Sequence, residues 1–171
     1  MKKLYTLLLW AVAAVPSLAQ TREQNLAKLG ITLPQLSPPI ASYVNSVRVG
    51  NLLFLSGKGP SKPDGSYITG KLGKDLNLEQ GQEAAKLAAI NHIAVLKHEL
   101  GDLSKVKRIV KVLGMVNCTD DFTNQPKVIN GYSDFMISIF GEKGRHARSA
   151  VGHNSLPMGM AVEVEVIVEV E

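Results

Sequence analysis

The side chains best suited to chemistry are concentrated in the carboxy-terminal residues 144–171. The alternating pattern over residues 161–170 predicts a strand. Because successive side chains of a strand point to opposite faces, its valines share one face and its glutamates share the other. The valine face requires a hydrophobic layer, which we expect helices to supply. The acidic face is either plain solvation or part of a site, and its carboxylates belong to Glu163, Glu165 and Glu169.

A second strand is predicted over residues 146–151, with His146 and Arg148 on the same face. If this strand pairs with residues 161–170, or lies near them, a guanidinium and a row of carboxylates approach the same place. A planar guanidinium binds a carboxylate through two parallel charge-assisted hydrogen bonds, which lysine cannot reproduce. A glutamate beside a bound water can supply orientation and proton transfer. The alternative is a buried or interfacial salt bridge between Arg148 and Glu163.

Composition limits the classes of protein that fit. The chain has 171 residues, of which 45% are hydrophobic, enough for one domain with an adequate core. Its formal net charge is +4, and Lys2 and Lys3 carry two of those charges. The remaining charge is too small to indicate a nucleic-acid partner. Cys118 is the only cysteine, which excludes an intramolecular disulfide and a thiolate metal cluster.

The first 19 residues are typical of a cleavable secretory signal. A basic tip at Lys2 and Lys3 precedes an apolar stretch over 4–15, and small residues end at Ala19. The apolar stretch is too short for a permanent membrane anchor. We therefore expect cleavage after Ala19 and export to the periplasm or the exterior, with no other membrane association.

The rest of the chain divides into an arm and a domain. A surface arm is predicted over residues 20–41, because a short amphipathic piece there ends at Gly30 and is followed by a proline-rich linker. Residues 42–171 predict the folded domain. It begins with strands over 43–49 and 52–56, which Gly50 and Asn51 join as a two-residue hairpin turn. Residues 57–73 predict a loop because glycine and proline are frequent there.

Two helices and one further strand complete the predicted elements. A helix over 78–100 begins with the capping pair Asn77 and Gln80 and ends at Gly101. His92 and His98 lie on different faces of this helix, so a shared metal is not expected. A strand over 105–117 alternates basic and apolar residues, which indicates a solvated strand and not a base-stacking surface. A second helix is predicted over 126–140.

This order of elements predicts an α+β domain, a mixed β-sheet with two helices packed on its valine face. The opposite face of the sheet is then left bare. A bare face that carries leucine, isoleucine and scattered charge favours self-association into a closed symmetric oligomer.

Five features in order carry a family resemblance. They are Tyr43, then Ser56-Gly57, Asn130 in the second helix, Ala147-Arg148-Ser149, and Glu163 within VEVE. From about Ser42 to its end the chain resembles the Rid family, also called YjgF-like and historically "endoribonuclease L-PSP", which has a chorismate-mutase-like fold. The most specific part is the arginine strand, with Leu156-Pro157 in the turn and Glu163 after it.

The resemblance implies a cofactor-free and metal-free homotrimer that hydrolyses reactive enamines and imines such as 2-aminoacrylate, with sites between subunits. It implies that Arg148 grips the substrate carboxylate and that Glu163 helps to position a water. The residues that it implies as shaping the pocket are Tyr43, Ser56, Gly57 and Asn130. Ser56 has no recognisable aspartate and histidine partners, so we interpret it as a wall and not a nucleophile. His146 and His153 are interpreted as loop or interface residues.

Two classes of function stay open at this point. One is an enamine/imine deaminase that releases 2-keto acid and ammonia. The other is a non-catalytic module that binds small carboxylates on the same trimeric fold, which accounts for export and for Lys58 and Ala150 at altered family positions. Ribonuclease activity is disfavoured by the low charge and by the lack of an acid–base histidine pair.

Overall fold

The structure is a computed structural model that describes residues 21–36 and 42–171. The predicted signal peptide, residues 1–19, and part of the predicted linker lie outside the described residues. Within the described ranges, no helix combines the length and the apolar character that crossing a bilayer requires.

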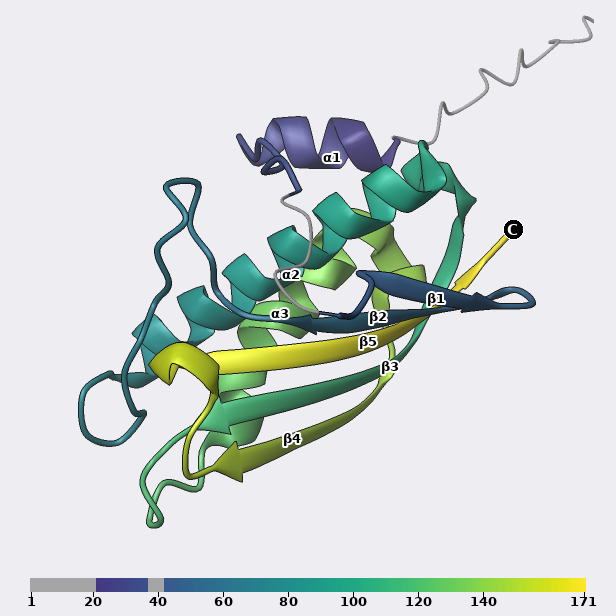
Figure 1. The fold of residues 1–171 in the computed structure, drawn as a ribbon. Coiled ribbons are helices and arrows are strands. Elements are labelled where there is room, and N and C mark those ends of the chain that lie inside the picture. Colours follow the sequence, from purple (N-terminus) through teal and green to yellow (C-terminus); the bar gives the residue numbers. More distant parts are fainter. Residues whose placement is uncertain (1–20, 37–41) are drawn as a thin grey trace, which may run out of the picture.

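A five-stranded mixed sheet forms the base of the molecule (Figure 1). Its strands lie in the order β1-β2-β5-β3-β4, and all neighbours are antiparallel except β3 and β4. Their bounds are β1 Ser46–Val49, β2 Leu52–Lys58, β3 Val106–Asn117, β4 Ala147–His153 and β5 Val162–Val170. The predicted hairpin is confirmed, since Gly50 and Asn51 join β1 to β2.

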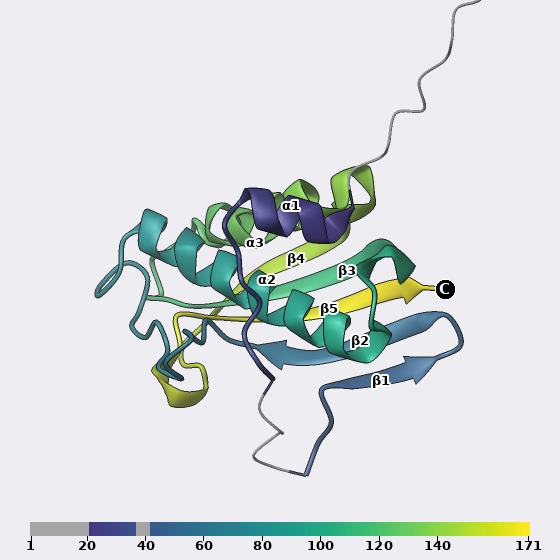
Figure 2. The ribbon, with the colours of Figure 1, turned by 90° about the horizontal axis from the view of Figure 1, so that it is seen from above.

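Two long helices cover one face of this sheet (Figure 2). Helix α2 runs over Leu78–Leu100 and has the predicted capping box, in which Asn77 and Gln80 each accept from the other's backbone N–H. Helix α3 runs over Gln125–Phe140. The valines of β5 face these helices, and none is more than 2% exposed. Burial of this apolar layer is the main force that holds sheet and helices together. The predicted α+β class is confirmed.

The predicted arm contains helix α1, Arg22–Lys28, which lies on the outer side of the helical layer (Figure 1). Leu26 of α1 is 4% exposed and belongs to the core. The side chain of Asn25 donates to the carbonyl of Ile139, 2.8 Å away, and Glu23 forms a salt bridge with Lys97 at 2.9 Å. This piece of the arm therefore packs onto the domain.

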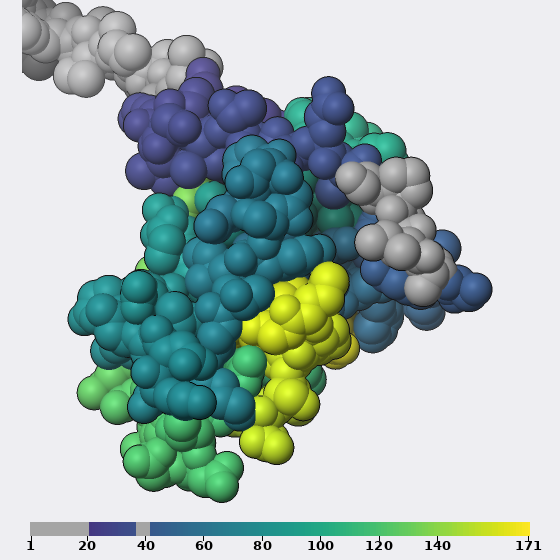
Figure 3. Space-filling model, turned by 60° about the vertical axis from the view of Figure 1, so that its left-hand side comes forward, coloured from purple at the N-terminus to yellow at the C-terminus, as the bar shows by residue number. Residues whose placement is uncertain are grey.

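One end of the molecule is made of loops (Figure 3). The long segment 59–77 lies beside the turn before β5 and the loop after β3. Gly70 N–H donates to the Gly159 carbonyl, and Leu72 N–H donates to the Asn117 carbonyl. Short 3-10 helices occur at Leu103–Lys105, Gly141–Gly144 and Pro157–Gly159. The two backbone hydrogen bonds of Gly70 and Leu72 attach the segment 59–77 to the turn that leads into β5 and to the end of β3.

The other face of the sheet is covered by no helix or strand of the described residues (Figures 1 and 2). Register places Phe54 opposite Ile167 there, and Leu113 opposite Glu165. Val47, Phe54 and Val151 on this face are 54%, 41% and 39% exposed. The bare face predicted from the sequence is thus present, and it combines apolar side chains with the carboxylates of β5.

Candidate active site

Arg148 projects from β4 onto the first half of α3. Its Nη1 donates to Asn130 Oδ1 at 3.0 Å and to Ser133 Oγ at 2.9 Å, and its Nη2 donates to the Pro126 carbonyl at 3.2 Å. Positions 126, 130 and 133 follow helical spacing and so share one face of α3. We call Pro126, Asn130 and Ser133 the α3 cradle.

The α3 cradle leaves part of the guanidinium available. An arginine has five N–H groups. Within the described residues, three of those of Arg148 have acceptors. Nε–H and one N–H of Nη2 remain, the two that form a side-on fork toward a carboxylate. Arg148 is half-buried, so this fork can be reached from solvent.

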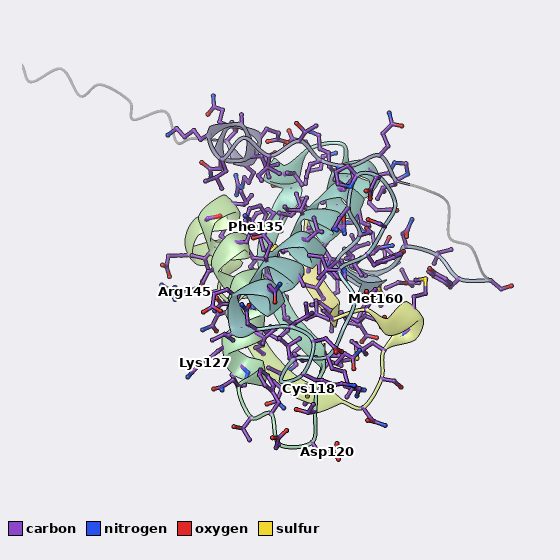
Figure 4. The ribbon with its side chains drawn as sticks, turned by 90° about the vertical axis from the view of Figure 1, so that its left-hand side faces the viewer. Cys118, Asp120, Lys127, Phe135, Arg145 and Met160 are labelled. Carbon is purple, nitrogen blue, oxygen red and sulfur yellow. The ribbon has the colours of Figure 1, made fainter. Side chains whose placement is uncertain are left out.

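Figure 4 shows the surroundings of the α3 cradle. Lys127 marks the first turn of α3, and Arg145 marks the segment that leads from the helix into β4. Because α3 and β4 follow each other in the chain, the helix face and the arginine are brought together by one crossover. The family resemblance implied Asn130 for this region. Ser133 was missed, although its spacing of three from Asn130 places it on the same face.

Glu163 lies on the bare face of the sheet, at the start of β5. Gly57 lies beside it, and a Cβ added there would overlap Glu163 Oε1. The register between β2 and β5 shifts between Leu55 and Lys58, so Gly57 occupies an irregular point of the strand pair. Only a residue without a side chain leaves the carboxylate where it is. We call Ser56, Gly57 and Glu163 the β2–β5 ledge.

The Glu163 carboxylate is half-buried, and within the described residues it has no hydrogen bond or salt bridge. Burial raises its pKa, the negative charge of Glu165 raises it further, and His153 acts weakly in the opposite direction. A carboxyl with a raised pKa accepts a proton more readily near neutral pH than an ordinary glutamate does. Its environment therefore suits proton transfer.

Ser56 closes the β2–β5 ledge on the side of β1. Its hydroxyl donates to the Val44 carbonyl at 2.6 Å, and its N–H donates to the Asn45 carbonyl at 3.0 Å. Tyr43, next to this fastened segment, is 51% exposed. Ser56 therefore tethers the segment that carries Tyr43, and its hydroxyl proton is engaged.

A buried imidazole supports the β2–β5 ledge from within the core. His92 Nε2 lies 3.2 Å from the Ser56 carbonyl, and its Nδ1 lies 3.0 Å from the Tyr132 hydroxyl. Burial lowers the pKa of His92 from its ordinary 6.5 to about 3. The ring is therefore neutral: Nε2–H donates to the Ser56 carbonyl and Nδ1 accepts from Tyr132. The sequence offered no signal for this role.

The α3 cradle and the β2–β5 ledge do not meet within one chain. Arg148 points to the helical side of the sheet, whereas Glu163 points to the bare side. Strand β3 separates them, with Arg148 opposite Val112 and Glu163 opposite Met115. From ordinary strand spacing and rise, their Cα atoms are about 14 Å apart. The proximity expected if the last two strands paired is therefore wrong for a single chain, because β5 pairs with β2 and β3 at the centre of the sheet.

A hollow in the surface of the single chain lies elsewhere on the molecule. It measures about 560 Å³ and lies at the far end of the bare face from Glu163, with Arg108, Arg145, His146 and Glu169 among its lining residues. Arg145 already pairs with Glu142 at 2.9 Å, and Arg108 stands opposite Glu169 in the strand register. Its charges are thus balanced, and neither Arg148 nor Glu163 lines it. In the described part of the chain, no three His, Cys, Asp or Glu side chains are arranged to hold a metal.

Comparison with known proteins identifies the family. The family model described as "YjgF/chorismate_mutase-like, putative endoribonuclease" matches residues 23–170. Protein TCP17 of Trypanosoma cruzi is 46% identical over 146 residues, which cover 85% of this chain and 91% of TCP17. A 2-iminobutanoate/2-iminopropanoate deaminase of Dermatophagoides farinae is 30% identical over 142 residues, 82% of this chain and 95% of the relative.

A solved structure agrees with these relatives. The crystal structure of a protein of unknown function from Agrobacterium tumefaciens is 42% identical and superposes with a TM-score of 0.82, covering 88% of this chain and 94% of that protein. The observed sheet order and helical layer match the chorismate-mutase-like fold. The chain therefore belongs to the YjgF-like family, the Rid family that its motifs predicted.

Proposed function

We propose that this protein hydrolyses reactive enamines and imines of the 2-aminoacrylate type to a 2-keto acid and ammonia, without a cofactor. Family membership supports the reaction class, and so does the deaminase relative. The observation that carries the proposal is the presence of two chemically distinct groups in one chain. One is an arginine with an available fork, and the other is a half-buried glutamate that has no partner among the described residues.

The chemistry needs little beyond these groups. An enamine tautomerises to the imine, whose carbon is electrophilic. Water adds to that carbon, and one of its protons moves to the nitrogen, which gives a carbinolamine. The remaining hydroxyl proton then moves to the nitrogen as well, and the C–N bond breaks to release ammonia and leave the ketone. Arg148 holds the carboxylate of the substrate, and Glu163 accepts the proton of the attacking water and returns it to the leaving nitrogen. One water is consumed, and no electrons are transferred.

The proposal includes a homotrimer with sites between subunits. The two halves lie on opposite sides of one sheet, so a small substrate cannot touch both within a single chain. A neighbouring subunit that places its β2–β5 ledge against the α3 cradle completes the site. The exposed apolar side chains of the bare face support such an association, since large exposed apolar patches mark interaction surfaces. Light scattering that gave a monomer mass at micromolar concentration would contradict it.

We also propose that the protein is exported and begins at Gln20. The basis is the sequence of residues 1–19 alone. Amino-terminal sequencing of the protein from fractionated cells tests this. Intact Met1 on cytoplasmic protein would refute it.

The decisive assay measures ammonia release from freshly generated 2-iminobutanoate and 2-aminoacrylate by the mature protein. Arg148→Ala should abolish the enzymatic part of the release. Arg145→Ala is the matched control, because it removes the same charge three residues away in an exposed surface pair. Release equal to the spontaneous rate, together with binding of 2-keto acids, would identify a carboxylate-binding module and overturn the deaminase.

A further inference from the structure

We propose that Ser133 and His146 are positioning residues for Arg148, which orient its fork for the carboxylate of the substrate. The inference rests on the proposed function for the identity of the ligand. Ser133 Oγ lies 2.9 Å from Arg148 Nη1 and 3.0 Å from His146 Nε2. His146 Nδ1 lies 2.7 Å from the Gly144 carbonyl. The four groups form one continuous chain of hydrogen bonds.

The direction of each bond in this chain is determined by chemistry. A backbone carbonyl can only accept, so His146 Nδ1 carries the proton and donates to Gly144. Burial lowers the pKa of His146 below its ordinary 6.5, the hydrogen bond to Gly144 acts in the opposite direction, and the charge of Arg148 lowers it further. The lowered pKa favours the neutral ring. Its Nε2 is therefore an acceptor and receives the hydroxyl proton of Ser133. The lone pairs of Ser133 Oγ are then directed to the guanidinium.

This arrangement fixes the guanidinium plane. Asn130 Oδ1 and Ser133 Oγ engage both N–H groups of Nη1, so the plane cannot turn about the Nε–Cζ direction without losing one of them. Without His146 as acceptor, the hydroxyl of Ser133 can rotate its proton toward Arg148. The O–H of Ser133 would then face the N–H of Arg148, and the hydrogen bond between them would be lost. His146 thus determines which way the hydroxyl points, and the hydroxyl determines which way the fork points.

Neither residue touches the fork itself. Nε–H and the remaining N–H of Nη2 lie on the other side of the guanidinium from Nη1. The expected contribution of Ser133 and His146 is therefore indirect and should be visible only while Arg148 is present. A double-mutant cycle measures this dependence directly.

The first experiment titrates the protein with pyruvate, the simplest 2-keto acid product, and follows binding by calorimetry. Ser133→Ala should weaken pyruvate binding about tenfold, the scale of one hydrogen bond to a charged group. Ser133→Thr retains the hydroxyl and should restore most of the affinity. Ser138→Ala is the matched control, since among the described residues the Ser138 hydroxyl bonds only the Phe135 carbonyl on the same helix.

The second experiment measures pyruvate binding by His146 variants, and by Ser133→Ala in a protein that lacks Arg148. His146→Leu should weaken pyruvate binding as Ser133→Ala does, and His146→Gln, which offers an amide oxygen to Ser133, should restore it. In an Arg148→Ala background, Ser133→Ala should cause no further loss. Equal losses with and without Arg148 would overturn the inference, because they would reveal a general effect on folding; melting temperatures of all variants accompany the titrations.

The outcomes separate this inference from the proposed function. If the wild-type protein binds pyruvate in a manner that depends on Ser133 but releases no ammonia, the positioning role stands and the deaminase fails. If the wild-type protein releases ammonia and Ser133→Ala binds pyruvate as tightly as wild type, the deaminase stands and the positioning role fails. A wild-type protein that binds no pyruvate would overturn the positioning role.

Discussion

The α3 cradle and the β2–β5 ledge differ in how their charged groups are satisfied. Arg148 has three protein acceptors, all from one helix that precedes its own strand. Glu163 has no hydrogen-bond partner within the described residues and occupies the space that a side chain at position 57 would fill. One charge is thus oriented before a ligand arrives, whereas the other is partly desolvated and left unpaired. Orientation suits a binding anchor, and an unpaired carboxylate suits proton transfer.

The two regions also share a design. Each is backed by a neutral histidine, and each histidine receives a hydroxyl proton from α3. Tyr132 donates to His92 behind Ser56, and Ser133, the next residue, donates to His146 behind Arg148. Helix α3 therefore supports both regions from adjacent positions. The comparison predicts that damage to the ledge should affect turnover, and damage to the cradle should affect binding first.

Removing the proton acceptor should have the largest effect. Glu163→Gln keeps the shape of the side chain but cannot accept a proton, so turnover should fall by roughly 10²- to 10⁴-fold while 2-keto-acid binding survives. Steady-state ammonia release and pyruvate titration measure the two quantities separately. Glu169→Gln, on the same face at the far end of β5, is the control and should retain activity. If wild type is the proposed trimer and Glu163→Gln is a monomer, Glu163 would instead be a structural residue.

Replacing the bidentate guanidinium of Arg148 by a point charge should have the second-largest effect. Arg148→Lys retains the positive charge but cannot form the bidentate contact, at a cost on the order of 2–4 kcal/mol, or roughly thirty- to a thousandfold. Part of this loss should appear as weaker pyruvate binding, because the anchor holds ground state and transition state alike. Arg145→Lys provides the matched comparison. Intact binding and turnover in Arg148→Lys would favour the salt-bridge interpretation.

A methyl group at Gly57 should have a smaller, selective effect. Gly57→Ala places a Cβ where Glu163 Oε1 now lies, so the carboxylate must move. A displacement of about 1 Å can cost on the order of 10²-fold in turnover. The displaced group is the end of a flexible side chain, so the melting temperature should change little. In a Glu163→Gln background the same substitution should cost little more turnover; a full further loss would show that Gly57 acts without Glu163.

The sequence predicted the elements better than it predicted their neighbours. The capping pair Asn77 and Gln80 located the start of α2, and the valine alternation identified the buried face of β5. Both signals are local and depend on geometry within a few residues. The position of β5 between β2 and β3 depends on pairing between distant strands, which no local pattern records. That position separates Arg148 from Glu163, and it is the reason that one chain does not bring together the two halves of the proposed site.

The residues that support Arg148 and Ser56 from behind could be predicted only in part. Ser133 follows Asn130 at helical spacing, so its place in the α3 cradle could have been deduced once that helix was accepted. His92 gave no such signal, because it lies on the buried side of a long helix, where it resembles any core position. His146 was placed on the same face as Arg148 in a strand predicted over 146–151, whereas β4 begins at Ala147, and the sequence did not indicate which helix lies beside it. Their roles depend on hydroxyl groups contributed by another element.

The smallest effect concerns stability and compares the two supporting histidines. The pKa of His92 is about 3 in the folded protein and about 6.5 when unfolded, so the unfolded chain binds the extra proton between these values. Folding stability should therefore fall as pH decreases from 6.5 toward 3, by at most about 1.4 kcal/mol per pH unit from this one group. The raised pKa of Glu163 makes stability rise as pH decreases through the pH range in which Glu163 titrates, so the pH dependence of wild type alone does not isolate His92.

Urea unfolding of wild type and His92→Gln between pH 4 and 7 isolates the contribution of His92 to the pH dependence of stability. The variant should be less stable than wild type at pH 7 but should lose less stability on acidification. His146→Gln should change this slope less, since His146 is only partly buried and its pKa is lowered by a smaller amount. Parallel pH dependence of stability in wild type and His92→Gln would mean that His92 is not held neutral behind Ser56. His92 and His146 would then not act as equivalent neutral supports.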